Sequence, residues 1–149
     1  MSPRKARPRA AAVARTAAPI GADDEKRLLA AARLARAHAH APYSRFRVGA
    51  AVLDERGLIH VGCNVENASY GLTVCAERNA VAAAIAAGAR RVRAVAVVTA
   101  MRPPARPCGA CRQVLRERGN DDTMVLMAPP MGGAERRRLG DLLPESFAL

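Results

Sequence analysis

Three of the four cysteines fall in two short segments, and each segment follows an expected loop and opens an expected helix. The segments read CAER at 75–78 and PCGACRQ at 107–113. Cys108 and Cys111 are about one helical turn apart, so their sulfur atoms face the same point beyond the helix end. Unpaired backbone N–H groups and the helix dipole favour the thiolate there. If Cys75 also opens its helix, the fold must bring two helix N-termini together around one metal ion.

A zinc ion held by these three thiolates keeps one tetrahedral position for water, and binding to zinc lowers the pKa of that water to about 7. Glu77 lies two residues from Cys75, where a carboxylate can take a proton from this water and deliver it to a substrate nitrogen. Three thiolates make the complex negatively charged, and Arg78 and Arg112 are candidates to offset that charge. The pattern is typical of zinc-dependent base deaminases.

Two other interpretations of the cysteines are weaker. Cys108 and Cys111 could form a thioredoxin-like redox pair, because they too follow a strand and open a helix. The chain lacks the Trp that is typical of such a motif, and a redox pair leaves Cys75 and Glu77 unexplained. A structural zinc site needs a fourth protein ligand. The candidates for a fourth ligand, for which we expect structural roles instead, are Cys63, His38, His40 and His60.

Hydrophobic periodicity and turn residues predict four helices and four strands. The helices are expected over 23–41, 75–87, 108–118 and 139–143. The strands are expected over 47–54, 58–63, 92–100 and 123–128, and the first two should form a hairpin. Asp23 and Asp24 stand where an N-cap belongs, and Gly88 and Gly119 end the second and third helices. This order predicts a three-layer α/β/α domain, with helices on both faces of a mixed sheet.

A chain of 149 residues has the length of one domain. Its core must consist of Val, Leu, Ile, Met and closely packed Ala, because 34 residues are alanine and only 3% are aromatic. An RNA-binding surface that stacks bases needs exposed aromatic side chains, so this composition counts against one. No apolar run approaches the roughly 20 residues that span a bilayer, and no secretory signal is recognised. We therefore expect a cytoplasmic protein with no membrane partner and with its cysteines kept as thiols.

The net charge of +11 raises the question of nucleic-acid binding. Residues 1–20 carry five of the basic residues and no acidic one, so nearly half of the excess lies in a segment rich in Pro and Ala. This composition predicts a disordered basic tail over residues 1–22 and one folded domain over 23–149. Because the remaining excess of +6 is spread over residues 21–149, we expect no nucleic-acid partner.

Four blocks of the sequence resemble the small zinc-dependent cytidine deaminases, in the same order and with the same spacing. The blocks are APYSRFRVGAA at 41–51, GCNVENASY at 62–70, CAER at 75–78 and PCGACRQ at 107–113. The resemblance extends from residue 24 to Phe147. It implies a mixed sheet of about five strands and one zinc ion per subunit, held by Cys75, Cys108 and Cys111. It also implies that Glu77 carries the proton.

The resemblance further implies how a nucleoside is held. Asn64 and Glu66 would grip the ribose 3′-hydroxyl. Phe46 would pack on the pyrimidine, and the backbone at Ala76 would contact the C2 carbonyl. Without the resemblance, we would interpret Asn64 and Glu66 as a polar turn after a strand, and Phe46 as a core residue.

The resemblance also implies a homotetramer, in which neighbouring subunits complete each active site. Tyr43, Tyr70 and Phe147 match positions used at such shared sites. Two departures from the family pattern are the Pro-rich segment 128–133 and Asn79, which stands where a small residue is more common. Neither is an expected zinc ligand, so we expect them to alter local geometry and not the reaction.

From these features we expect hydrolytic deamination of cytidine and 2′-deoxycytidine to uridine and 2′-deoxyuridine, a reaction of pyrimidine salvage. The alternatives within the enzyme class are deamination of a cytosine-containing antibiotic nucleoside, of another base, or of a base in a polynucleotide. Asn64 and Glu66 favour a free nucleoside. A nucleic-acid-binding module with a structural zinc ion is an alternative from another class. It predicts four zinc ligands and no dependence of function on Glu77.

Overall fold

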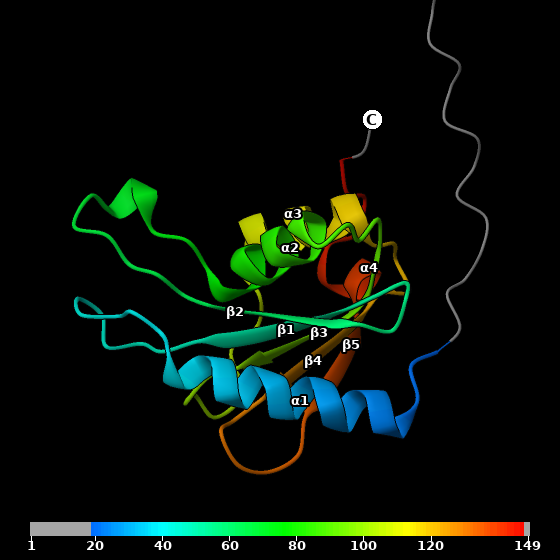
Figure 1. Cartoon of the computed structure of the whole chain (residues 1–149), viewed down its shortest axis with the longest axis horizontal. Helices are drawn as coiled ribbons and strands as arrows, with labels where there is room; N and C mark the ends of the chain where they lie inside the picture. Colours follow the sequence, from blue (N-terminus) through cyan, green and yellow to red (C-terminus); the bar gives the residue numbers. More distant parts are fainter. Residues whose placement is uncertain (1–18, 148–149) are drawn as a thin grey trace, which may run out of the picture.

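Residues 19–147 are described by a computed structural model of the chain (Figure 1). The helices are α1 (Ala22–Ala37), η1 (Tyr70–Leu72, a 3₁₀ turn), α2 (Ala76–Ala86), α3 (Gly109–Arg118) and α4 (Leu139–Leu142). The strands are β1 (Gly49–Asp54), β2 (Ile59–Cys63), β3 (Val92–Val98), β4 (Met124–Ala128) and β5 (Glu135–Arg138). None of the helices in this range is both long and apolar enough to cross a membrane.

The five strands form one mixed sheet in the order β2-β1-β3-β4-β5. β1 pairs antiparallel with both β2 and β3, and β4 pairs antiparallel with β5. β3 and β4 are parallel, and α3 lies in the connection between them. Parallel neighbours need such a crossover, because a two-residue turn cannot join them. The predicted hairpin of β1 and β2 is confirmed, as is the mixed sheet.

Helices cover both faces of this sheet, which confirms the three-layer prediction. α1 lies on one face, whereas α2, α3 and α4 lie on the other (Figure 1). Alternate residues of β1 serve the two layers, with Ala50 and Val52 packing in the α2 core and Ala51 and Leu53 in the α1 core. Alanine at half of these positions keeps the layers close, as expected for a core with few aromatic side chains.

Two glycines allow the helices to approach the hairpin closely. A Cβ atom added at Gly62 of β2 would lie 2.5 Å from the carbonyl oxygen of Ala76 and 2.4 Å from the amide nitrogen of Ala80, both in α2. At Gly49 of β1 it would lie 2.1 Å from the carbonyl oxygen of Ala32 in α1. The absence of a side chain at Gly62 therefore lets the N-terminus of α2 rest directly on β2.

Some details of the prediction were wrong. The N-cap of α1 is Gly21 and not Asp23 or Asp24, which lie in the first turn and favour it through their charge. β5 was not among the predicted strands, because its residues show no alternation of apolar side chains. Residues 1–18 of the predicted tail over 1–22 lie outside the described residues. The last residue of the predicted tail, Ala22, is the first residue of α1.

Candidate active site

The N-termini of α2 and α3 bring three cysteines together. Cys75 is the N-cap of α2, Cys108 is the N-cap of α3, and Cys111 lies buried in the first turn of α3. Their sulfur atoms all lie within 4.8 Å of one another, and those of Cys75 and Cys108 are 3.9 Å apart. Tetrahedral zinc with Zn–S bonds of about 2.3 Å requires sulfur atoms roughly 3.8 Å apart. The cluster therefore fits zinc, as the spacing of the cysteines predicted.

The thiols of the cluster perturb one another. A hydrogen bond with Cys111, helped by one with Cys108 and by the charge of Arg78, lowers the pKa of Cys75 to about 6, although burial opposes the change. The pKa of Cys111 is raised, because its proton is shared with Cys75 and the site is buried near Glu77. Without a cation, these thiols cannot all ionise at once. A divalent metal ion removes that conflict.

Glu77 stands beside this cluster in the first turn of α2. Its side chain lines the same cavity as Cys75 and Cys108, yet the residue is only 5% exposed. Burial raises the pKa of Glu77, and the nearby Cys75 adds to the effect. A carboxyl group whose pKa lies above its ordinary value is suited to take up and release a proton near neutral pH.

The cavity beside the cluster has a volume of about 170 Å³. Its walls include Phe46 and Ala76, the two residues predicted to contact the base. The end of β3 and the loop that follows it complete the walls. The lining residues are Phe46, Val48, Asn64, Thr73, Cys75, Ala76, Glu77, Val97, Thr99, Ala105, Arg106 and Cys108. The structure thus brings Phe46, Asn64 and Ala76 to the same cavity as Glu77 and the cysteine cluster.

Asn64 holds the loop that carries Phe46. Its side-chain amide donates to the carbonyl oxygen of Phe46 at 2.8 Å, and its side-chain oxygen accepts from the amide of Val48 at 2.8 Å. Asn64 is 7% exposed, so these bonds are largely shielded from water. The residue therefore positions Phe46 at the wall of the cavity.

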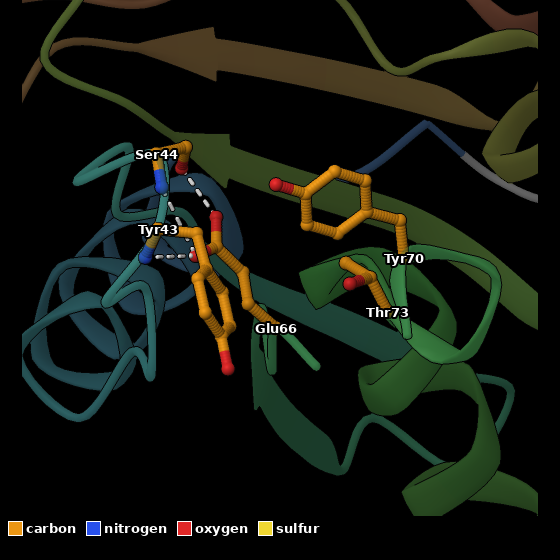
Figure 2. Close-up of a pocket in the computed structure, with 5 residues that line it drawn as sticks. All are labelled: Tyr43, Ser44, Glu66, Tyr70 and Thr73. Carbon is orange, nitrogen blue, oxygen red and sulfur yellow. Dashed lines mark hydrogen bonds between the residues drawn. The ribbon is translucent and has the colours of Figure 1, made fainter. Parts of the chain in front are cut away.

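Glu66 faces a second, more open cavity of about 370 Å³, which is also lined by Tyr43, Ser44, Tyr70 and Thr73. Figure 2 shows Glu66 between the segment of Tyr43 and Ser44 on one side and the side chains of Tyr70 and Thr73 on the other. The Glu66 carboxylate accepts from the amide nitrogens of Tyr43 at 2.9 Å and of Ser44 at 3.2 Å, and from the Ser44 hydroxyl. These bonds, led by that of the Ser44 hydroxyl, lower the pKa of Glu66.

Other predicted residues lie apart from the two cavities. Phe147 is 69% exposed and lines neither of them, although its carbonyl oxygen accepts from the side chain of Gln113. Arg112 donates to the carbonyl oxygens of Pro107 and Leu142, both at 2.8 Å, so it ties α3 to the segments beside it. Of the two charge-offsetting candidates, only Arg78 affects the pKa of a cluster thiol.

Among residues 19–147, the metal-binding group contains the three cysteines alone. Cys63 is half-buried in β2, and His60 bonds to the buried carboxylate of Asp54 at 3.0 Å. The fourth ligand that a structural zinc site requires is therefore absent from this part of the chain. An open coordination position is what a catalytic zinc ion needs.

Sequence reasoning missed several hydroxyl side chains of the site, including those of Thr99 and Thr73. Thr99 is 2% exposed and lines the cavity of the cluster, where its hydroxyl accepts from the amide of Ala105 at 3.3 Å. Thr73 lines both cavities. The only sequence signal for Thr73 was its place two residues before Cys75, and that position alone does not say where a side chain points.

A family profile described as the cytidine and deoxycytidylate deaminase zinc-binding region matches residues 22–127. The chain belongs to this family. It is 44% identical over 125 residues to the cytidine deaminase of Sporosarcina psychrophila, an alignment that covers 84% of this chain and 92% of that protein. It is also 50% identical over 115 residues to the cytidine deaminase of Mycobacterium tuberculosis, covering 77% and 83% of the two chains.

Solved structures agree with this assignment. The crystal structure of cytidine deaminase from Burkholderia pseudomallei superposes with a TM-score of 0.78 at 48% identity, covering 82% of this deaminase and 98% of that chain. The cytidine deaminase structure from Mycobacterium tuberculosis gives a TM-score of 0.75 at 46% identity, covering 85% and 98%. This deaminase is a hydrolase that converts cytidine, and its cofactor is zinc. The predicted activity is confirmed at this level.

Proposed function

We propose that Cys75, Cys108 and Cys111 hold the zinc ion of this deaminase and that Glu77 is its catalytic proton carrier. The observation that carries the proposal is that three sulfur atoms at zinc-compatible distances and a buried carboxyl group line or adjoin one cavity. Arg78 supports the cluster by offsetting part of its negative charge. The N-termini of α2 and α3 act in the same direction, because their dipoles favour thiolates.

The reaction needs protons moved at two nitrogen atoms of the base. Zinc, when bound, supplies a water molecule of lowered pKa at its open position. We assign to the Glu77 carboxylate the transfer of a proton to N3 of cytosine, and later of a proton to the departing amine. Burial serves this role, since it keeps the pKa of Glu77 raised and excludes bulk water from the proton path.

The two cavities suggest how a nucleoside lies. We place the pyrimidine in the smaller cavity against Phe46, with its C2 carbonyl at the backbone of Ala76. The sugar then extends toward Asn64 and Glu66, whose side chains hold the ribose 3′-hydroxyl. Since this contact does not involve the 2′-hydroxyl, we propose that both cytidine and 2′-deoxycytidine are substrates, as in pyrimidine salvage.

We further propose a homotetramer in which neighbouring subunits complete each site. The support is that aromatic side chains are exposed. Around the larger cavity, Tyr43 is 52% and Tyr70 77% exposed, and Phe147 is also exposed. Exposed aromatic groups of this size are typical of interfaces. Light scattering on the eluting peak of a size-exclusion column measures the assembly. We place the enzyme in the cytoplasm, where reducing conditions keep the thiols available for zinc.

The decisive experiment compares wild-type protein with Glu77→Gln by following the ultraviolet absorbance change of cytidine, with zinc content measured on both samples. We expect Glu77→Gln to keep its zinc and to lose about 10²- to 10⁴-fold in kcat, as is typical for loss of a general acid and base. Glu117→Gln is the matched control, because it makes the same change on the exposed part of α3 and should behave as wild type.

Two results would overturn the proposal. Undiminished turnover by zinc-loaded Glu77→Gln removes Glu77 from the chemistry. A zinc-loaded wild type that leaves cytidine and 2′-deoxycytidine untouched removes the free-nucleoside assignment, and deamination of modified nucleosides is then tested next. Salt-dependent binding to duplex DNA, together with indifference to Glu77→Gln, is the result that a nucleic-acid-binding module with a structural zinc ion predicts.

A further inference from the structure

Thr73 occupies the junction between the two cavities of the site. It lines the smaller cavity together with Cys75 and Glu77, and the larger one together with Glu66. No other residue lines both of these cavities. In Figure 2 its side chain lies on the opposite side of Glu66 from the segment of Tyr43 and Ser44. A nucleoside with its base in one cavity and its sugar toward the other must pass this side chain.

The hydroxyl of Thr73 has a hydrogen to donate. Its oxygen accepts from the amide nitrogen of Asn67 at 3.1 Å, which fixes the side chain against its own loop. Within residues 19–147 its hydrogen has no protein acceptor at hydrogen-bond distance. A threonine hydroxyl can accept and donate at the same time, so the bond from Asn67 leaves its donor capacity intact.

The groups that the proposed function assigns to the sugar supply few hydrogen-bond donors. Glu66 can only accept, and it already receives bonds from Tyr43 and Ser44. The side-chain amide of Asn64 has two hydrogens and donates one of them to the carbonyl oxygen of Phe46, which leaves one for the sugar, although a ribose carries more than one hydroxyl. A sugar hydroxyl that donates to the Glu66 carboxylate still needs a donor for its own oxygen, and leaving that oxygen unpaired on binding weakens affinity.

We propose that the Thr73 hydroxyl donates a hydrogen bond to a sugar hydroxyl of the nucleoside and so helps this deaminase to select its sugar. The inference rests on the proposed function, because it takes Glu66 as the other partner of the sugar. Thr73 is then a substrate-binding residue that acts on the affinity for the nucleoside and not on the proton transfers at the base.

The test uses Thr73→Val, which keeps the shape of the side chain but removes the hydroxyl, and Thr73→Ser, which keeps the hydroxyl. Each protein is assayed with cytidine, 2′-deoxycytidine and 3′-deoxycytidine, and its zinc content is measured. For cytidine we expect Thr73→Val to lose about 2- to 12-fold in kcat/KM, mainly through KM, as for one uncharged hydrogen bond. Thr73→Ser should restore the wild-type value within about twofold.

The deoxynucleosides separate binding from loop structure. The loss caused by Thr73→Val should disappear with the analogue that lacks the accepting hydroxyl, since nothing remains there for Thr73 to bond. Asn67→Ala is the matched control, because it removes the bond from the amide of Ser69 to the Asn67 side chain in the same loop and leaves the Thr73 hydroxyl in place. Any loss caused by Asn67→Ala should be equal for all three nucleosides.

An equal loss for all three nucleosides with Thr73→Val, or no loss for any, overturns the inference about Thr73. The proposed function fails separately. It fails if wild-type protein with zinc does not turn over cytidine, or if Glu66→Gln leaves KM unchanged. A large effect of Glu66→Gln with no effect of Thr73→Val rejects only the assignment of Thr73.

Discussion

The zinc cluster and the larger cavity are built from different kinds of structure. The three cysteines and Glu77 sit at the starts of two helices that pack on the sheet, and Cys111 and Glu77 are both buried. The larger cavity is lined by two connecting segments, 41–47 and 64–74, and its aromatic side chains are exposed. The layer of packed helices therefore holds the groups to which we assign the chemistry, whereas the connecting segments hold the groups to which we assign the sugar.

The two regions also obtain their geometry differently. At the cluster, helix periodicity and the contact of Gly62 with α2 fix where the sulfur atoms point. At the larger cavity, side chains hold loop backbone, as Glu66 does for Tyr43 and Ser44. Changes at the cluster should consequently abolish the reaction, whereas changes at the loops should mainly alter the affinity for the nucleoside.

The largest effect is expected from Cys111→Ala. Removal of this proposed ligand, which is buried, leaves two cysteines for the metal, so the protein should lose its zinc and all measurable turnover. Its melting temperature should also fall, because a ligand that binds only the folded state stabilises it. Zinc analysis and the cytidine assay measure the first effect, and thermal unfolding measures the second.

Cys63→Ala is the matched control for Cys111→Ala. Cys63 is also a free, partly buried cysteine, but it lies in β2 and outside the cluster. It should keep a full complement of zinc and wild-type kcat. If Cys63→Ala loses zinc as Cys111→Ala does, the ligand set derived from the cluster is wrong.

An intermediate effect is expected from Glu66→Gln. The substitution replaces a charged acceptor by a neutral amide, which should raise KM for cytidine about 10- to 100-fold, in line with hydrogen bonds to charged groups. The zinc content should not change. Since the pKa of Glu66 is lowered in the folded protein, its bonds persist above the ordinary pKa of a glutamate and are lost only as the pH falls below it. The KM ratio of the two proteins should therefore be constant around neutral pH.

Glu55→Gln provides the control for Glu66→Gln. The carboxylate of Glu55 likewise accepts from two backbone amides, those of Arg90 and Arg91, and its pKa is likewise lowered, first by the bond from Arg91. It lines neither cavity. We expect Glu55→Gln to lower the free energy of unfolding slightly and to leave KM unchanged. A similar rise in KM for both variants contradicts a direct role of Glu66 at the sugar.

The zinc cluster was predictable from the sequence because its geometry is local. Helix periodicity places Cys108 and Cys111 on one side of a first turn, and the short separation of Cys75 and Glu77 in the sequence keeps both at the start of α2. The buried strands were predictable because their apolar residues form compact runs. β5 was not, because its pairing depends on backbone hydrogen bonds to β4 while its side chains, Glu135–Arg138, are all charged.

The larger cavity was less accessible to sequence reasoning. Asn64 and Glu66 were identified only through the resemblance to a family, because taken alone they have the pattern of a turn. Their contacts join segments about twenty residues apart, and no periodicity connects Glu66 with Tyr43. Thr73 faces both cavities because of the path of its loop. The predicted position of Phe147 in a shared site depends on neighbouring subunits and stays a prediction.

The smallest effect is expected at Asn79, which links the two regions. Its side-chain amide donates to the carbonyl oxygen of Cys63 at 2.8 Å, and thereby ties α2, which begins at the cluster, to the end of β2, which leads into Asn64. Most members of the family are expected to have a small residue at this position, so α2 should hold its place largely through other contacts. The close packing of α2 on Gly62 supplies such contacts.

Asn79→Ala removes the hydrogen bond but improves helix propensity. The bond contributes about 0.5–1.5 kcal/mol, while alanine favours a helix over asparagine by roughly 0.5 kcal/mol, so we expect a net loss below about 1 kcal/mol in urea unfolding. Zinc content, kcat and KM should stay near wild-type values, since Asn79 lines neither cavity. Loss of zinc from Asn79→Ala would show that the alignment of α2 depends on this one bond and not on the glycine contact, and the separation between the two regions would then be much weaker than their structures indicate.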